Sequence, residues 1–181
     1  LSGKLKLTFG MIEVIARHGK LRSLRILENS LLSDGDMETL CKTWCCNAGE
    51  TRLKCLDFSA LAAGGILADT AGHAIASFLQ AGAGITELRL AGQRMSSDAL
   101  AACLNHGSAL ELVDFTGTNL DIARDYGPSS RAPVRSLLVG GCTDYCDGHH
   151  GVSTSLKCII AVLPTLVVLN VSNANIDDDA V

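Results

Sequence analysis

One apolar template recurs along this chain and restricts the fold more than any other feature of the sequence. An apolar residue is followed by a second three positions later and by a third two positions after that, as in Leu21, Leu24 and Ile26. The template begins again at Leu53, Ile85, Leu110, Val134 and Leu166. These starts are 32, 32, 25, 24 and 32 residues apart, so we expect one structural unit to be repeated along the chain.

Residues 85–107 form the most regular copy of this unit. Ile85, Leu88 and Leu90 are typical of a short strand start with inward apolar side chains, and Leu100, Cys103 and Leu104 share one helical face. We expect Ser97 and Asp98 to cap the helix by accepting hydrogen bonds from its first N–H groups. We expect Gly107 to end the helix in a left-handed conformation.

Most of the other units also contain a segment with helical spacing of apolar residues. We expect helices within residues 4–17, 37–45, 70–80 and 153–163. A residue that ends helices follows each of them, namely Gly19, Gly49, Gly82 and Pro164. The fourth unit has no good helical pattern, and the polar residues 121–133 are typical of an irregular loop.

The composition suits thin stacked layers better than one bulky centre. The chain is 48% hydrophobic but only 4% aromatic, so Leu, Ala, Val and Ile must build the core. One strand and one helix cannot bury their apolar faces alone, and each unit therefore needs a neighbour. We expect residues 1–181 to form one α/β domain, with a partial first repeat at 1–20, six strand units at 21–176 and a truncated repeat at 177–181.

The template resembles the leucine-rich repeats of the ribonuclease-inhibitor-like type. The pattern of that family, LxxLxLxx(N/C)xL, is met in full by residues 21–31, with Asn29, and by residues 134–142 with Cys142 at the asparagine position. The other units carry Leu61, Gln93, Thr118 and Ala174 there. We therefore expect an incomplete asparagine ladder, in which Gln93 and Thr118 retain side chains able to hydrogen-bond the neighbouring turn.

The resemblance implies a curved right-handed solenoid of about six repeats, with parallel strands on the concave face and helices on the convex face. Terminal repeats of such arrays carry polar caps, which residues 1–20 and 177–181 do not provide. We expect a piece of a longer array, or ends that stay partly open. Residues 114–120 and 165–171 resemble segments of centrosomal and ciliary leucine-rich-repeat proteins.

The resemblance places one strand position of each unit on the concave face, namely Arg25, Asp57, Arg89, Asp114, Leu138 and Asn170. Neighbouring strands are about 4.8 Å apart, so the alternating charges of the first four strands can pair with one another at little gain in stability. The alternative is a recognition strip for a protein partner, to which Glu87 adds a charge. Leu112, Leu138 and Val168 make the C-terminal part apolar, which often marks a protein contact unless a further repeat or an internal loop covers it.

Charge and motifs exclude several classes of function. A net charge of −4 argues against a nucleic-acid surface, and no apolar run approaches the roughly 18 residues of a membrane span. The chain contains no catalytic or nucleotide-binding fingerprint, so we expect no enzyme and no cofactor. A protein-binding scaffold is favoured. The alternative is a regulator of a small GTPase, in which Arg94 stabilises phosphoryl-transfer charge.

The cysteines indicate a reduced, intracellular and cytoplasmic setting. We expect buried thiols on helix faces at Cys41, Cys45, Cys103 and Cys158, where they pack as small hydrophobic groups. A ligand-like cluster occurs at Cys142, Cys146, His149 and His150. Its spacing matches no strong zinc template, so we expect a solvated loop there rather than a metal site.

Overall fold

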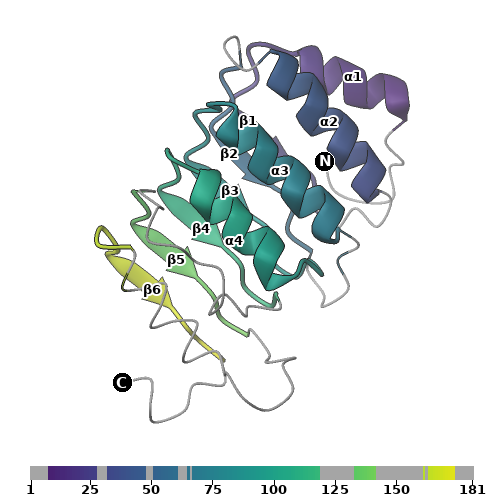
Figure 1. The fold of residues 1–181 in the computed structure, drawn as a ribbon. Helices are drawn as coiled ribbons and strands as arrows, with labels where there is room; N and C mark the ends of the chain where they lie inside the picture. Colours follow the sequence, from purple (N-terminus) through teal and green to yellow (C-terminus); the bar gives the residue numbers. More distant parts are fainter. Residues whose placement is uncertain are drawn as a thin grey trace.

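The structure is a computed structural model, and it describes residues 8–27, 32–47, 51–60, 65, 67–118, 133–141, 161 and 163–173. These residues form an α/β arrangement of helices and short strands (Figure 1). The helices are α1 (Phe9–Arg17), α2 (Asp34–Cys46), α3 (Asp69–Gln80) and α4 (Ser97–His106). The strands are β1 (Ser23–Arg25), β2 (Cys55–Asp57), β3 (Glu87–Arg89), β4 (Leu112–Asp114), β5 (Ser136–Leu138) and β6 (Val168–Asn170).

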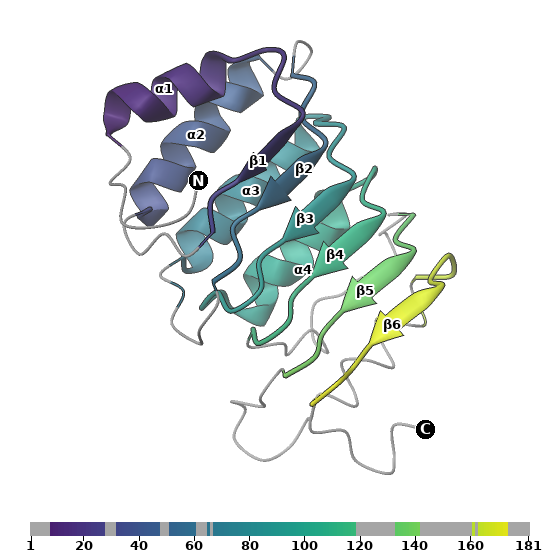
Figure 2. The ribbon, with the colours of Figure 1, turned by 180° about the vertical axis from the view of Figure 1, so that it is seen from behind.

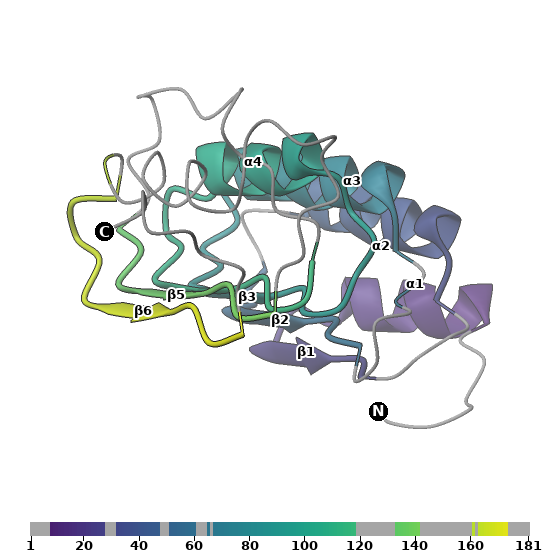
Figure 3. The same ribbon diagram turned by 90° about the horizontal axis from the view of Figure 1, so that it is seen from below.

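The six strands form one parallel sheet in which the order in space is the order in the chain (Figure 2). The register aligns the middle residues of neighbouring strands, namely Leu24, Leu56, Leu88, Val113, Leu137 and Leu169. Helices α2, α3 and α4 lie side by side on one face of this sheet, and α1 packs against α2 (Figure 3). Among the described residues, no helix or strand lies on the other face, which we call the open face.

The core lies between the sheet and the helices. The middle residues of β1 to β5 are buried there, together with the aromatic residues Phe58 and Phe115 that follow two of the strands. From the helix layer, Trp44 of α2 and Phe78 of α3 pack in a tilted arrangement with their ring centroids 5.1 Å apart. The predicted template thus marks the residues that fill the core.

The backbone after four of the strands has the same left-handed conformation, at φ 70° for Gly92, 66° for Gly117, 64° for Gly141 and 57° for Asn173. Glycine adopts this conformation without steric cost, and asparagine tolerates it. The N–H group of Gly92 donates to the carbonyl of Thr116 at 2.7 Å, and Gly117 and Gly141 make the corresponding bonds to the next unit at 2.8 Å. These bonds join the turns of neighbouring units.

The Gln93 side chain makes the bridge that was predicted for it. Although only 7% of the residue is exposed, its Oε1 accepts from the N–H of Leu67 at 3.1 Å and its Nε2 donates to the carbonyl of Phe58. The Thr118 hydroxyl donates instead to the carbonyl of Phe115 in its own unit, at 2.7 Å. A threonine hydroxyl sits one bond from the branched carbon, so it reaches nearby backbone where the longer glutamine spans two units.

The remaining positions of the predicted asparagine ladder are Asn29, Leu61, Cys142 and Ala174, and they lie outside the described residues. The helix predicted at 153–163 and the irregular loop predicted at 121–133 lie almost wholly outside them as well. These predictions therefore stay predictions.

Both ends of α4 differ from the prediction. The capping residue is Ser96, whose hydroxyl accepts from the N–H of Ala99 at 3.4 Å, so the assignment of the cap to Ser97 and Asp98 is wrong. Gly107 has φ −82° and is not left-handed. Its lack of a side chain serves close packing, because a Cβ atom there would lie 2.1 Å from Cδ1 of Leu110.

The other described helices follow the predicted apolar faces closely. In α2 the buried residues are Met37, Leu40, Cys41 and Trp44, while Cys45 is half-buried. In α3 the predicted face is buried except for Ala74, which is half-buried. Gly82, which is predicted to end this helix, follows α3 and has φ +87°, a left-handed conformation that glycine adopts readily. None of the described helices has the length and apolar character needed to cross a membrane.

Candidate binding face

The open face is built from the first and last residue of each strand, because successive strand residues point to opposite faces and the middle ones are turned to the helices. The first residues are Ser23, Cys55, Glu87, Leu112, Ser136 and Val168. The last residues are Arg25, Asp57, Arg89, Asp114, Leu138 and Asn170. All of the predicted partner-binding residues therefore lie on one continuous surface.

Arg89 is held among carboxylates at the centre of this face. Its Nε donates to Oε1 of Glu87 at 2.5 Å, and the strand register sets Asp57 and Asp114 on its two sides. Burial by itself would lower the pKa of Arg89. The hydrogen bond and charge of Glu87, together with the charges of Asp57 and Asp114, outweigh that effect and raise the pKa. Arg89 is therefore a fixed cation, stabilised from its own strand and from both neighbours.

The polar residues that end β2, β4 and β6 also have a local structural role. In each case a side-chain oxygen accepts from the backbone N–H two residues later, as Asp57 does from Ser59 at 3.2 Å, Asp114 from Thr116 at 3.0 Å and Asn170 from Ser172 at 3.0 Å. Such bonds form turns that end a strand. The repeated Asp or Asn before an apolar residue and a Ser or Thr is a sequence signal for this role.

Accessibility differs strongly along the open face. Cys55 and Asp57 of β2 are each 6% exposed; Asp57 stands between Arg25 and Arg89, and Cys55 stands between Ser23 and Glu87. Val168 of β6 is 51% exposed, and Leu112 and Leu138 are half-buried. The apolar surface that a partner can reach is therefore concentrated towards β5 and β6.

A second row of side chains borders the open face at the N-terminal ends of the strands. We call this row the rim, and it consists of Arg22, Lys54, Thr86, Glu111, Arg135 and Val167. Backbone hydrogen bonds keep these residues in line, since the N–H of Lys54 donates to the carbonyl of Arg22 and that of Arg135 to the carbonyl of Glu111. All of them are exposed except Thr86, which is half-buried. The rim adds charges and one exposed valine to the candidate site.

A cavity of about 750 Å³ lies between α2 and α3, away from the open face. Cys41, Cys45 and Cys46 contribute to its wall, opposite His73, Ala74 and Ser77. Burial, with the neighbouring thiols Cys45 and Cys103, raises the pKa of Cys41, and burial with Cys46 raises that of Cys45. Both effects disfavour the thiolate, and for Cys45, in the last turn of α2, the C-terminal end of the helix does so as well. The cavity therefore holds no activated nucleophile at these two positions.

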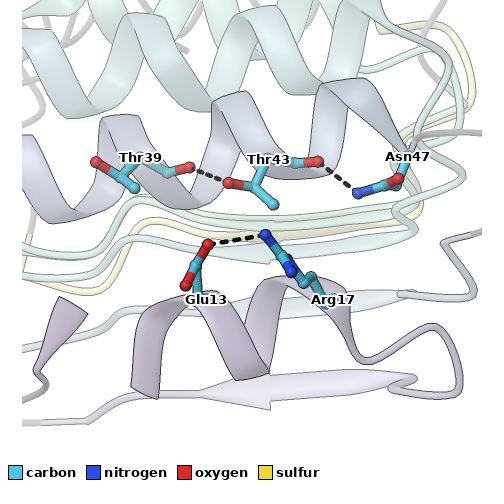
Figure 4. A network of polar contacts seen from close by, with 5 residues as sticks. All are labelled: Glu13, Arg17, Thr39, Thr43 and Asn47. Atoms are coloured by element: carbon cyan, nitrogen blue, oxygen red, sulfur yellow. Dashed lines mark hydrogen bonds and ion pairs between the residues drawn. The ribbon is translucent and has the colours of Figure 1, made fainter. Parts of the chain in front are cut away.

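The opposite side of α2 carries a polar stripe of Thr39, Thr43 and Asn47 (Figure 4). Each side chain donates to a carbonyl one turn earlier in the same helix, at 2.9, 2.9 and 3.0 Å. On the neighbouring helix α1, Arg17 pairs with Glu13 at 2.8 Å. These polar groups are already satisfied within their own helices, so the α1–α2 side is a weak candidate for a binding site.

Two aspartates connect neighbouring units on the helix side, and the sequence patterns did not indicate them. Oδ1 of Asp34, the first residue of α2, accepts from the N–H of Ala68 at 2.9 Å. Oδ1 of Asp69, the first residue of α3, accepts from the N–H of Ser96 at 2.6 Å. Each bond reaches the residue that caps the next helix. These aspartates hold successive helices in line rather than forming a site.

Arg94 and the cluster from Cys142 to His150 are the alternative sites that the sequence offers. Arg94 is exposed in the turn before α4, and its backbone N–H donates to the carbonyl of Leu67 at 3.1 Å. The cluster from Cys142 to His150 lies outside the described residues. Across the part of the chain that is described, no group of three or more His, Cys, Asp or Glu residues is arranged to hold a metal ion.

Neither models of known protein families nor curated protein sequences match this chain.

Proposed function

We propose that the chain is a leucine-rich-repeat solenoid of the ribonuclease-inhibitor-like type that binds a protein partner on its open face and catalyses no reaction. The recurring template, the parallel strands in chain order and the helices on one face support this proposal. It includes a curved sheet with the open face on the concave side and right-handed crossovers between strands.

The observation that carries the proposal is the accessible apolar end of the open face. Val168 is 51% exposed, and the register sets it next to Ser136, which in turn pairs with Leu112. Leu138 lies beside this row, next to Asn170. Exposed apolar groups bordered by polar and charged side chains are typical of protein interfaces. Acidic net charge favours a protein over a nucleic acid as the partner.

The thiols support a cytoplasmic location for this binding protein. Cys41, Cys45, Cys46, Cys55 and Cys103 are all free within the described residues. Free thiols in this number are typical of a reducing compartment. An association with the cytoskeleton or the centrosome is part of the proposal, and it rests on the resemblance of two short segments alone.

Site-directed photo-crosslinking tests where the partner binds. A benzophenone amino acid replaces Val168 on the open face, or Val14 of α1, which is 69% exposed and serves as the matched control. After irradiation in an extract of the cells that make the protein, we expect one dominant crosslinked protein from position 168 and none from position 14. The same product from both positions, or a product from position 14 alone, would contradict the proposal.

A further inference from the structure

We propose that two copies of this chain join edge to edge through β6, with the two strands antiparallel and related by a two-fold axis that passes beside Leu169. This inference goes beyond the proposed function, because it needs no partner on the open face. It rests on the backbone groups that face away from β5, on the residues that β6 carries and on the exposure of Leu169.

The same backbone hydrogen bonds join each pair of neighbouring strands in the described sheet. The carbonyl of the rim residue accepts from two N–H groups of the next unit, as Thr86 does from Glu111 and Leu112 at 2.8 and 3.0 Å. The N–H four residues after the rim residue donates to the next strand, as Leu90 does to Asp114 at 2.8 Å. Two groups of each unit are therefore always turned toward the following strand.

Strand β6 is the last strand of the sheet (Figure 2), and its corresponding groups are the carbonyl of Val167 and the N–H of Val171. Among the described residues, neither group has a hydrogen-bond partner. Residues two apart in a strand turn their backbone groups to the same side, so the N–H and the carbonyl of Leu169, midway between them, face this edge as well. The edge thus offers donors and acceptors in a fixed order.

This order is self-complementary. When a second β6 runs antiparallel, with its Leu169 opposite Leu169 of the first, the two leucines exchange both of their backbone hydrogen bonds. The N–H of Val171 in each copy then meets the carbonyl of Val167 in the other, so each of these donors finds an acceptor. A two-fold pairing of this kind closes on itself, whereas a head-to-tail pairing continues as a filament.

Strand β6 also brings no charge to such a pairing. Each of the other described strands has at least one charged residue on the rim or the open face, but residues 165–173 contain none. Edge strands that remain unpaired in proteins are commonly protected by charged side chains, especially lysine. In the antiparallel pair, Val168 lies opposite Asn170 and Val167 opposite Val171, so like charges do not meet.

The exposure of Leu169 supports the same pairing. Leu169 belongs to the row of middle residues that is buried from β1 to β5, yet it is 37% exposed, whereas Leu137 in the neighbouring strand is fully buried. In the pair, the two Leu169 side chains cover each other on the helix side of the sheet. Val168 stays on the open face, so the face that is proposed to bind a partner remains accessible.

Hydrogen exchange of single amides at increasing protein concentration tests the pairing without any substitution, beside sedimentation velocity on the same samples. From about 1 to 500 µM, the range expected for a small interface, we expect a monomer to become a dimer. Exchange at Leu169 and Val171 should slow at least about tenfold in the dimer. The Val168 amide is the internal control and should change much less, because it already donates to the carbonyl of Arg135 at 2.8 Å.

Two variants test the two-fold axis. Leu169→Lys and Leu169→Glu each set like charges opposite each other, so each alone should stay monomeric at concentrations at which the original protein is a dimer. An equal mixture sets opposite charges together and should form a heterodimer. This rescue requires an arrangement in which position 169 faces itself. Circular dichroism checks that both variants fold, and the exchange experiment decides alone if they do not.

Three results would overturn the inferred dimer. One is a monomer at all concentrations. The second is a dimer in which exchange at Leu169 and Val171 is unchanged, or in which the mixed, folded variants do not associate. The third is slow exchange at these two amides in the monomer, which would mean that the edge is covered from within the chain. The proposed function fails separately, because dimerisation is measured on the purified protein without a partner.

Discussion

The two faces of the sheet differ in how far packing determines their residues. On the face under the helices, every strand carries Leu or Val at its middle position, and from β1 to β5 that residue is buried. On the open face, no two strands carry the same pair of residues. A position that must fill a close-packed layer accepts few side chains, whereas a position facing solvent accepts many. The residues of the open face, which packing leaves free to differ, can therefore determine function.

The two faces of the sheet differ less at its C-terminal end. Leu169, the middle residue of β6, is 37% exposed, whereas Leu88 at the same position of β3 is fully buried. Val167 on the rim of β6 is 78% exposed. Strand β6 therefore exposes apolar side chains on the open face, on the rim and on the face that is turned to the helices. Its residues can serve packing as well as binding.

The largest effect should come from the buried face. Leu88→Ala removes a fully buried side chain and leaves a cavity, so we expect the free energy of unfolding to fall by about 2–5 kcal/mol. The matched change on the open face, Leu138→Ala, should cost no more than about 1 kcal/mol. Urea unfolding followed by circular dichroism measures both. Equal losses in the two variants would show that the faces do not differ as described.

A smaller loss is expected where a buried polar side chain joins two units. Gln93→Leu leaves the N–H of Leu67 and the carbonyl of Phe58 without their partner, so we expect a loss of about 1–3 kcal/mol in the same urea assay. Thr118→Val is the control, because the hydroxyl bonds only within its own unit. If the Thr118 variant lost as much stability as the Gln93 variant, bridging between units would not be the cause.

The hydrogen bond from the Ser96 N–H to Asp69, which connects the starts of α4 and α3, should contribute less to stability than the Gln93 bridge. Asp69→Ala removes the acceptor for the N–H of Ser96, and we expect a loss of about 0.5–2 kcal/mol, as for other groups that satisfy free N–H groups at helix starts. Hydrogen exchange should show the Ser96 amide losing protection in this variant. Protection equal to that of the original protein would mean that another group replaces Asp69.

The smallest effect on stability should come from the ion pair of the open face. Glu87→Gln removes the charge that pairs with Arg89, and an exposed or half-exposed pair contributes no more than about 1 kcal/mol. We expect a small decrease in the midpoint temperature of unfolding, and this difference from the original protein should disappear in high salt. A loss comparable to that of Leu88→Ala would mean that the open face is held by its charges.

The residues that fill the core could be predicted because their pattern is local. The spacing of Leu21, Leu24 and Ile26 repeats with every strand, and alternation alone then decides which side chains face the helices. Ser96, Ser97 and Asp98 can all cap a helix, so composition could not decide which one does. The bond from Asp69 to Ser96 requires knowing which turns are neighbours in space.

The residues of the candidate site could be predicted from the resemblance to leucine-rich repeats, but the solvent exposure of each residue could not. The resemblance placed Asp57 and Val168 on one face, yet 6% of the first and 51% of the second is exposed. Their accessibility depends on the side chains of neighbouring strands, whose aligned residues lie 32 positions away in the chain. The sequence of a single strand carries no information about the neighbouring side chains that cover it.

We propose that the open face binds the partner and that the helix side does not. The most direct test is the Kd of Leu138→Glu with Val168→Glu for the protein crosslinked from position 168, measured beside Val14→Glu. We predict that the open-face variant binds at least about 100-fold more weakly, since each buried contact at an interface centre contributes about 1–2 kcal/mol or more. Val14→Glu should bind normally, and both variants should unfold cooperatively. An open-face variant that folds and binds as the original protein does would contradict the claim.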